Sequence, residues 1–201
     1  MIYQIFTTCL IFTFLSSCSP VSSSKRVSKE EVKKTLTMDQ DWLFWRGSDG
    51  SGVSKQTNLP DILSLDDESL LWSHEIQGGG VPVIAGGRAY QFGYYGVEEE
   101  LEEALVCFDA ASGEILWERT HSDFISDIVY NRYGVGAASV DPATGNVYFQ
   151  TSPGLLIGYD SDGNKLWERS LMEEFARLTF PNGRTGGPCV DGDLVIIHAI
   201  T

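Results

Sequence analysis

The chain has few of the side chains on which hydrolases and metalloenzymes depend. Its 201 residues include only three histidines and four cysteines. The histidines fall in no metal-binding spacing, and no Cys-x-x-Cys-His sequence for haem attachment is present. No nucleophile elbow and no Ser-His-Asp order stands out. The sequence therefore predicts neither a metal site nor a catalytic residue.

Basic residues are also scarce, with 14 against 28 acidic residues and a formal net charge of −14. Five of the basic residues lie between residues 25 and 34. The chain after residue 34 therefore has 9 basic and 26 acidic residues, a formal charge of −17. Such a surface repels phosphate backbones, which argues against nucleic acid as a partner. The charge suits a basic protein partner, but solubility alone would also account for it.

No hydrophobic run is long enough to predict a membrane span, since the apolar stretch at residues 1–20 is short. It contains Leu15-Ser16-Ser17-Cys18, which resembles the bacterial lipobox. The resemblance implies that residues 1–17 are a lipoprotein signal peptide and that Cys18 is acylated. Ser19 beside it favours the outer membrane, with the protein facing the periplasm. An ordinary signal peptide or short anchor is the alternative, and export is expected either way.

Residues 18–38 are Ser-rich, then charged, and contain no aromatic residue. This composition is typical of a flexible tether that holds a soluble domain away from the membrane. Residues 39–201 are expected to form that domain.

A repeated segment organises the domain. Residues 106–117 (VCFDAASGEILW) predict a strand, a tight turn and a second strand, because an aspartate can hold turn N–H groups and a glycine supplies the positive φ. The segment recurs at residues 157–167 (IGYDSDGNKLW), with a turn one residue shorter. The residues that define the two copies are Asp109, Ser112, Gly113 and Trp117, then Asp160, Gly163 and Trp167.

The tryptophans that close these segments, with Trp72 before them, are spaced 45 and 50 residues apart. Simpler hairpins are expected upstream of each segment, at residues 82–90, 139–148 and 188–195. Each repeat thus supplies about four short antiparallel strands, which cannot bury both faces alone and must stack around an axis. The sequence predicts an all-β fold, a β-propeller of four-stranded blades.

About 160 residues follow the leading segment, enough for three to four blades, whereas a propeller needs at least four and more often seven or eight. We therefore expect a partial propeller and a fragment of a longer protein. A chain that completes its ring by assembling with further copies is the alternative.

The repeated residues resemble the pyrroloquinoline-quinone-like β-propeller repeat family, which includes quinoprotein dehydrogenases and BamB-type envelope lipoproteins. That family's tryptophan-docking motif, A-x-D-x-x-T-G-x-x-x-W, matches Asp109, Ser112, Gly113 and Trp117. The resemblance implies that each indole packs on the turn of the neighbouring blade. Residues 41–60 are similar to a W-x-x-W-R-G-x-x-x-x-G leader of a bacterial subset, which packs on the propeller.

Two inter-blade segments each contain an arginine close to aromatic residues and glycines. In quinoprotein dehydrogenases the corresponding segments approach the axis where the cofactor sits. Arg132 and Arg184 are thus candidates to face an anionic ligand, although structural roles would produce the same pattern. Residues 98–103, with five glutamates, are expected to be an exposed hairpin tip. Cys107 and Cys189 occupy different repeat positions, so no disulfide is expected between them.

The resemblance implies a non-catalytic scaffold, BamB-like, that binds envelope proteins through its rim loops and the membrane through an N-terminal lipid, without a cofactor. The alternative is a dehydrogenase of alcohols or sugars that uses pyrroloquinoline quinone and calcium, with ligands beyond residue 201. A third possibility is capture of carbohydrate or peptide on an aromatic face formed by Tyr94, Tyr95, Tyr130 and Tyr133.

Overall fold

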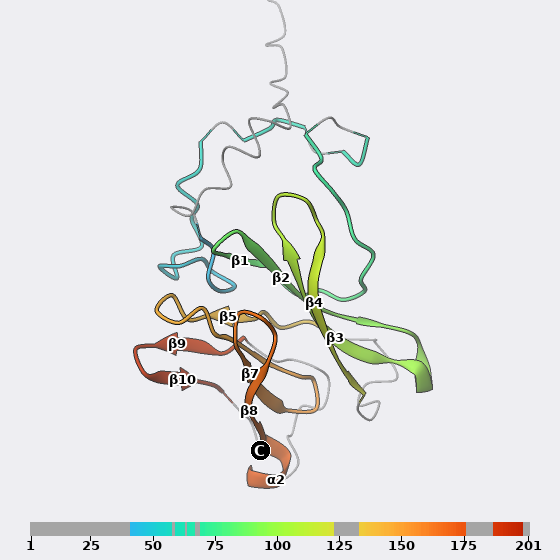
Figure 1. Ribbon diagram of the computed structural model, residues 1–201, viewed down its shortest axis with the longest axis vertical. Helices are drawn as coiled ribbons and strands as arrows, with labels where there is room; N and C mark the ends of the chain where they lie inside the picture. Colours follow the sequence, from blue (N-terminus) through green and yellow to red (C-terminus); the bar gives the residue numbers. More distant parts are fainter. Residues whose placement is uncertain are drawn as a thin grey trace, which may run out of the picture.

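The computed structural model describes residues 41–57, 59–62, 64–66, 69–122, 133–175 and 187–198. Within these residues, ten strands form three antiparallel sheets, and the predicted all-β class is confirmed (Figure 1). The first sheet contains β1 (Val83–Ala85), β2 (Arg88–Tyr95), β3 (Glu102–Asp109) and β4 (Ile115–Ser122). The second contains β5 (Ser139–Val140), β6 (Val147–Gln150), β7 (Leu155–Tyr159) and β8 (Lys165–Ser170). The third contains β9 (Cys189–Asp191) and β10 (Leu194–Ile196).

In the described ranges, two short helices accompany the strands, the 3₁₀ turn η2 (Glu98–Glu100) and α2 (Leu171–Phe175). Within the described part of the chain, no helix combines the length and hydrophobicity that crossing a bilayer requires.

The three sheets are successive copies of one blade. Each four-stranded sheet pairs its strands in chain order. The first strand pairs in the same register in all three sheets, with Val83 opposite Tyr90, Ser139 opposite Tyr148 and Cys189 opposite Ile196. The two-stranded sheet therefore corresponds to the first half of a third blade.

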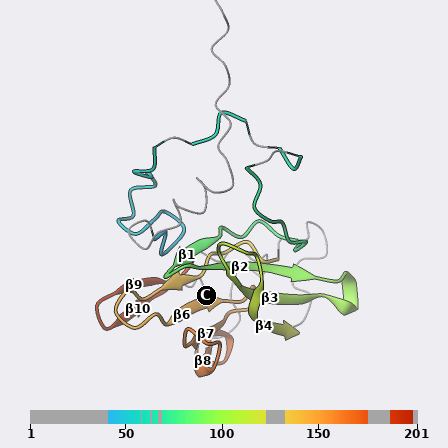
Figure 2. The ribbon, with the colours of Figure 1, turned by 45° about the horizontal axis from the view of Figure 1, so that its top comes forward.

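The first strands of the blades lie together, because β1 contacts β5 and β5 contacts β9. They form the inner edge of the arrangement, and β4 and β8 lie at the outer edge (Figure 2). The β1–β2 and β3–β4 turns lie at one end of the blade and are hydrogen-bonded, Ala110 N to Gly87 O, 2.9 Å. We call this end the turn face, and the opposite end, where β2 turns into β3 and β4 leads to β5, the connection face.

A continuous apolar core fills the space between the first two blades. Side chains from one face of the first sheet pack on the second, for example the Phe92 and Phe149 rings at 5.3 Å between centroids. The opposite face of the first sheet, around Val106 and Phe108, is covered by Trp72 and Ile76. Because both faces of the first blade are buried, each blade depends on its neighbours for stability.

Tryptophan docking joins the blades. Trp117 Nε1, in β4, donates to Ser161 O in the β7–β8 turn at 2.9 Å, and the indole lies over Gly163. Trp72 repeats the arrangement on the first blade, donating to Ala110 O at 3.0 Å and lying over Gly113. The segment around Trp72 is not part of a strand. Trp167 stacks on Tyr148 of its own blade, 5.6 Å between centroids.

Arg119 and Arg88 extend this junction. Arg119 donates from Nε to Gly163 O at 2.8 Å and lies over the Trp117 ring. Arg88 donates to Ser161 O and to Asp162 Oδ1. One short turn of the second blade thus receives an indole and two guanidinium groups from the first.

Two glycines test the docking, because Gly87 and Gly113 share a φ of 76° but differ in surroundings. A Cβ on Gly113 would lie 2.5 Å from Trp72 Cγ, whereas one on Gly87 meets nothing within 4 Å. Alanine at either position adopts a left-handed conformation that costs about 1–2 kcal/mol. Gly113→Ala should lower the free energy of unfolding by a further ~1–3 kcal/mol through overpacking, measured by chemical denaturation. Equal losses for both variants would contradict close docking of Trp72.

Candidate functional site

The inner edge of the blades is covered by residues 41–52, which we call the leader loop. Trp42 pairs with Ile84 of β1 through two hydrogen bonds, Trp42 N to Ile84 O at 2.8 Å and Ile84 N to Trp42 O at 2.9 Å. The next residue, Leu43, accepts a bond at its carbonyl from Val140 N of β5, 2.9 Å. Two consecutive leader residues therefore bond the inner strands of two different blades.

The leader loop is held at the turn face. Asp41 Oδ1 accepts from Gly86 N, in the β1–β2 turn, at 3.2 Å. Both figures show the loop, in blue, beside β1 (Figures 1 and 2). The Leu43 side chain packs on the core between the blades.

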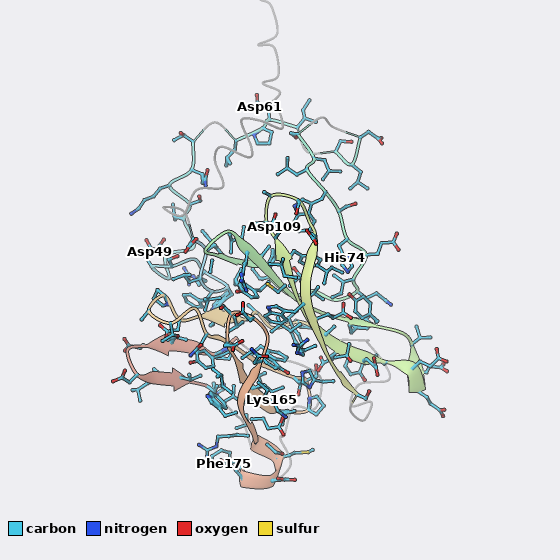
Figure 3. The ribbon with its side chains drawn as sticks, viewed as in Figure 1. Asp49, Asp61, His74, Asp109, Lys165 and Phe175 are labelled. Atoms are coloured by element: carbon cyan, nitrogen blue, oxygen red, sulfur yellow. The ribbon has the colours of Figure 1, made fainter. Side chains whose placement is uncertain are left out.

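Hydrogen bonds within the leader loop fix its shape. Ser48 Oγ donates to Asp41 O, and Gly52 N donates to Arg46 O at 2.9 Å. Arg46 Nη2 donates to Ser51 O at 3.1 Å, so this arginine has the backbone-carbonyl partner expected of a structural residue. Hydrogen bonds from Ser51 lower the pKa of Asp49, which Figure 3 shows in the same loop.

A cavity of about 400 Å³ separates the leader loop from the third blade. The loop lines it with Phe44 and Asp49, β5 with Ser139 and Val140, and β9 with Val190. Its lining mixes apolar side chains with hydroxyl and carboxylate groups, a composition typical of ligand pockets. This cavity and the leader loop form the candidate site.

Glu103 corrects the expectation that residues 98–103 are an exposed, solvated tip. Glu98, Glu99 and Glu100 are exposed, but Glu103 lies within β3 and is only 2% exposed. Its carboxylate accepts from Gly134 N at 2.9 Å, from Ser152 N at 2.7 Å and from Ser152 Oγ. Glu103 thus connects the first blade to the second at the connection face. The sequence signal that could have placed it there is the unbroken apolar run that follows it at residues 104–108, a pattern consistent with a fully buried strand.

Cys18, Arg132 and Arg184 lie outside the described residues, and so does Tyr130. The described tyrosines do not form the exposed aromatic face considered above. Tyr94 and Tyr133 are buried and contact each other, 5.9 Å between centroids. Tyr95 donates to Glu118 and contacts His74, and burial and Glu118 raise its pKa to about 12.

The motif aspartates serve the turns rather than an open site. Asp109 Oδ1 accepts from Ser112 Oγ and from the N–H groups of Ala111 and Ser112. Asp160 accepts from the side chain and the N–H of Asn164 instead. These hydrogen bonds lower the pKa of both carboxyls, with the side-chain donor the largest cause in each.

The described cysteines, Cys107 and Cys189, are free thiols. Burial raises the pKa of Cys107 to about 11, so the thiol stays protonated at neutral pH and is a poor nucleophile. Among the residues that the structure describes, no three His, Cys, Asp or Glu side chains lie close enough together to hold a metal ion.

The repeated blades and their docked indoles define a β-propeller of pyrroloquinoline-quinone-like repeats. The family model described as outer membrane protein assembly factor BamB matches residues 60–200, and the chain belongs to that family. A comparison with curated protein sequences gives no significant match.

Two solved dehydrogenase structures share the fold, and a solved BamB structure was also compared. Quinohemoprotein alcohol dehydrogenase from Comamonas testosteroni is 20% identical, with a TM-score of 0.50 over 87% of this chain and 25% of that chain. A europium-containing methanol dehydrogenase is 18% identical, with a TM-score of 0.54 over 85% of this chain and 29% of that one. BamB from Moraxella catarrhalis is 10% identical, with a TM-score of 0.32 over 64% of this chain and 45% of that chain. The chain thus spans between a quarter and a third of the length of the two dehydrogenases.

The β3–β4 turn, which contains Asp109, and the β7–β8 turn, which contains Asp160, provide a matched test of the carboxylate pKa values. Ser112→Ala removes the main donor to Asp109 and should raise the pKa of Asp109 toward its ordinary 3.8, while that of Asp160 stays unchanged. Carboxyl ¹³C NMR titration measures both in one sample. Because the folded-state pKa is lowered, Asp109 stabilises the fold above pH 3.8 and loses that contribution as the pH falls through the lowered value. Ser112→Ala should therefore reduce the loss of stability in acid.

Glu103→Gln tests the buried carboxylate. The amide nitrogen of glutamine cannot accept the hydrogen bonds that one carboxylate oxygen accepts, so a buried donor loses its partner. The free energy of unfolding should fall by about 1–3 kcal/mol in chemical denaturation. Glu100→Gln, on an exposed residue of the same segment, is the control and should change it by less than about 0.5 kcal/mol. Equal effects would show that the Glu103 contacts contribute little.

Proposed function

We propose that the chain belongs to a lipid-anchored envelope protein whose propeller binds other envelope proteins and has no catalytic activity of its own. Membership in the family named for an outer-membrane protein assembly factor supports this class of function. The lipobox-like sequence ending in Cys18 supports an anchor facing the periplasm.

One structural observation carries the proposal. The distinctive side chains of the repeat are used to hold blades together: indoles and Arg119 bond the next turn, and Asp109 and Asp160 bond their own turns. Residues that only maintain the stacking leave recognition to the loops at the blade ends, which is how scaffold propellers present a binding surface.

The β2–β3 hairpin end is the loop we propose for partner contact. It projects beyond the sheets in both views (Figures 1 and 2). Val97 at this end is 63% exposed and is followed by three exposed glutamates, Glu98–Glu100. An exposed apolar side chain beside negative charges suits a partner with a basic rim around an apolar patch.

Affinity capture of the full-length protein from cross-linked, detergent-solubilised envelopes tests this proposal. We expect a reproducible set of envelope proteins, and a several-fold lower yield when Val97 is replaced by Ser and Glu98–Glu100 by Gln. Val53→Ser is the matched control, since Val53 is an equally exposed valine (68%) in another segment. Recovery of no partner would contradict the scaffold function.

Addition of pyrroloquinoline quinone and calcium to the same preparation tests the dehydrogenase alternative. Stoichiometric binding of the quinone with alcohol or sugar oxidation would replace the scaffold function. No quinone absorbance after gel filtration is the expected result.

A further inference from the structure

The β2–β3 hairpin is a place where the first blade departs from the repeat. Tyr90 in β2 and Tyr148 in β6 hold equivalent positions in their blades. Tyr90 pairs with Cys107, 17 positions later in the chain, whereas Tyr148 pairs with Gly158, ten positions later. The hairpin of the first blade is therefore longer by seven residues. This extra length includes the hairpin end assigned above to partner contact.

The base of the longer hairpin is attached to the second blade through Glu103. Ser152 N and Oγ donate to the Glu103 carboxylate, and so does Gly134 N. Ser152 lies between β6 and β7, in the short turn that the second blade has in place of the longer hairpin. The Tyr94 and Tyr133 rings pack together in the same region. The longer hairpin of one blade thus bonds the shorter turn of the next.

The segment that precedes the first blade holds the other edge of the hairpin base. Tyr94 pairs with Glu103 on its β3 side and with Gln77 on its other side. Gln77 N donates to Tyr94 O at 3.1 Å, and Tyr94 N donates to Gln77 O at 2.9 Å. A Cβ on Gly93 would lie 2.5 Å from Gln77 O, so the two backbones are in close contact. The hairpin base is therefore held on both sides before its exposed end begins.

The use of a carboxylate at this junction has a physical consequence. Burial of a charged group is costly unless hydrogen bonds compensate it, and Glu103 is only 2% exposed. An apolar residue, such as the buried Leu105 nearby in β3, would avoid this cost, but apolar packing is non-directional. Hydrogen bonds need their donors in defined directions. The carboxylate therefore fixes the angle between the hairpin and the second blade as well as joining them.

From this geometry we propose that Glu103 is a positioning residue for partner binding. It holds the hairpin end, Val97 and Glu98–Glu100, in one orientation relative to the second blade. A partner then binds a surface that is already ordered, which reduces the entropy cost of association. This inference rests on the proposed function, because it takes the hairpin end as the partner contact.

Residual dipolar couplings of the full-length protein, measured by NMR, test the orientation. In the wild type the amide couplings of Val97, Glu99 and Leu101 should fit the same alignment tensor as those of β6 and β7. In Glu103→Gln they should fall to half or less, because the hairpin end then samples several orientations. The couplings within β6 and β7 should stay unchanged, as evidence that the second blade is folded.

Ser152→Ala is a milder variant of the same junction, since it removes the hydroxyl donor and keeps the N–H donor. It should lower the hairpin couplings in the same direction but by less than Glu103→Gln. Unchanged couplings in whichever of these two variants folds would overturn the proposal.

Gly163→Ala is the matched control, because it disturbs the junction of the same two blades at the turn face. A Cβ on Gly163 would lie 2.7 Å from Trp117 Cδ2. The hairpin couplings of this variant should equal those of the wild type. Equal decreases in Gly163→Ala and Glu103→Gln would show that Glu103 only stabilises the blade junction in general, and would overturn the proposal.

The capture experiment tests whether partner binding depends on this orientation. Glu103→Gln should lower the yield of captured envelope proteins severalfold. Added to the variant with Val97→Ser and Gln at Glu98–Glu100, it should cause no further loss, because both changes act through the hairpin end. Additive losses would overturn the proposal.

The two experiments separate failure of this inference from failure of the proposed function. Full capture by the variant changed at Val97 and Glu98–Glu100 would show that the hairpin end is not the partner contact. Unchanged dipolar couplings in Glu103→Gln would show that Glu103 does not position it, whatever the partner.

Discussion

The contact of one indole with the turn of the next blade is the interaction on which this structure depends. A four-stranded sheet with two apolar faces has no stable form in water by itself, and its strands are too short to twist into a closed core. The docked Trp117 buries these faces, because its ring fills the space between the sheets, and its N–H donates to Ser161 O, a carbonyl that Arg88 also bonds. Gly163 is required because the ring occupies the place of a side chain.

The polar groups around this contact show how two copies of a motif reach the same geometry with different residues. Ser112 bonds Asp109 in the longer turn, and Asn164 bonds Asp160 in the shorter one. In both, the carboxylate organises the turn and the following glycine admits the indole. In the β7–β8 turn, Arg119 adds a further attachment by donating to Gly163 O. The blade junction is thus a composite of turn chemistry, aromatic packing and charge-assisted hydrogen bonds.

The fold was predictable from the sequence because its signals are hairpin turns and alternating apolar residues, which are local, together with a turn-and-tryptophan segment that recurs after 45 to 50 residues. The expectation that the leader packs on the propeller came instead from the resemblance of residues 41–60 to the leader of a bacterial subset of the family. Its place on the inner edge could not be predicted, since Trp42 and Leu43 bond through backbone atoms that every residue has. Glu103 was misassigned because a run of glutamates indicates solvent exposure, whereas its partner Ser152 lies in the next blade, far along the chain.

The leader loop also has a consequence for the order of assembly. Leu43 is made before any blade, yet its carbonyl bonds Val140, which follows the whole first blade in the chain. Loop-closure entropy makes such a non-local contact unfavourable until the intervening chain is compact. The first segment of the domain to be synthesised is therefore among the last to reach its final place. The first two blades must fold before the leader can bond both β1 and β5. A leader in its final place therefore requires that both blades have formed.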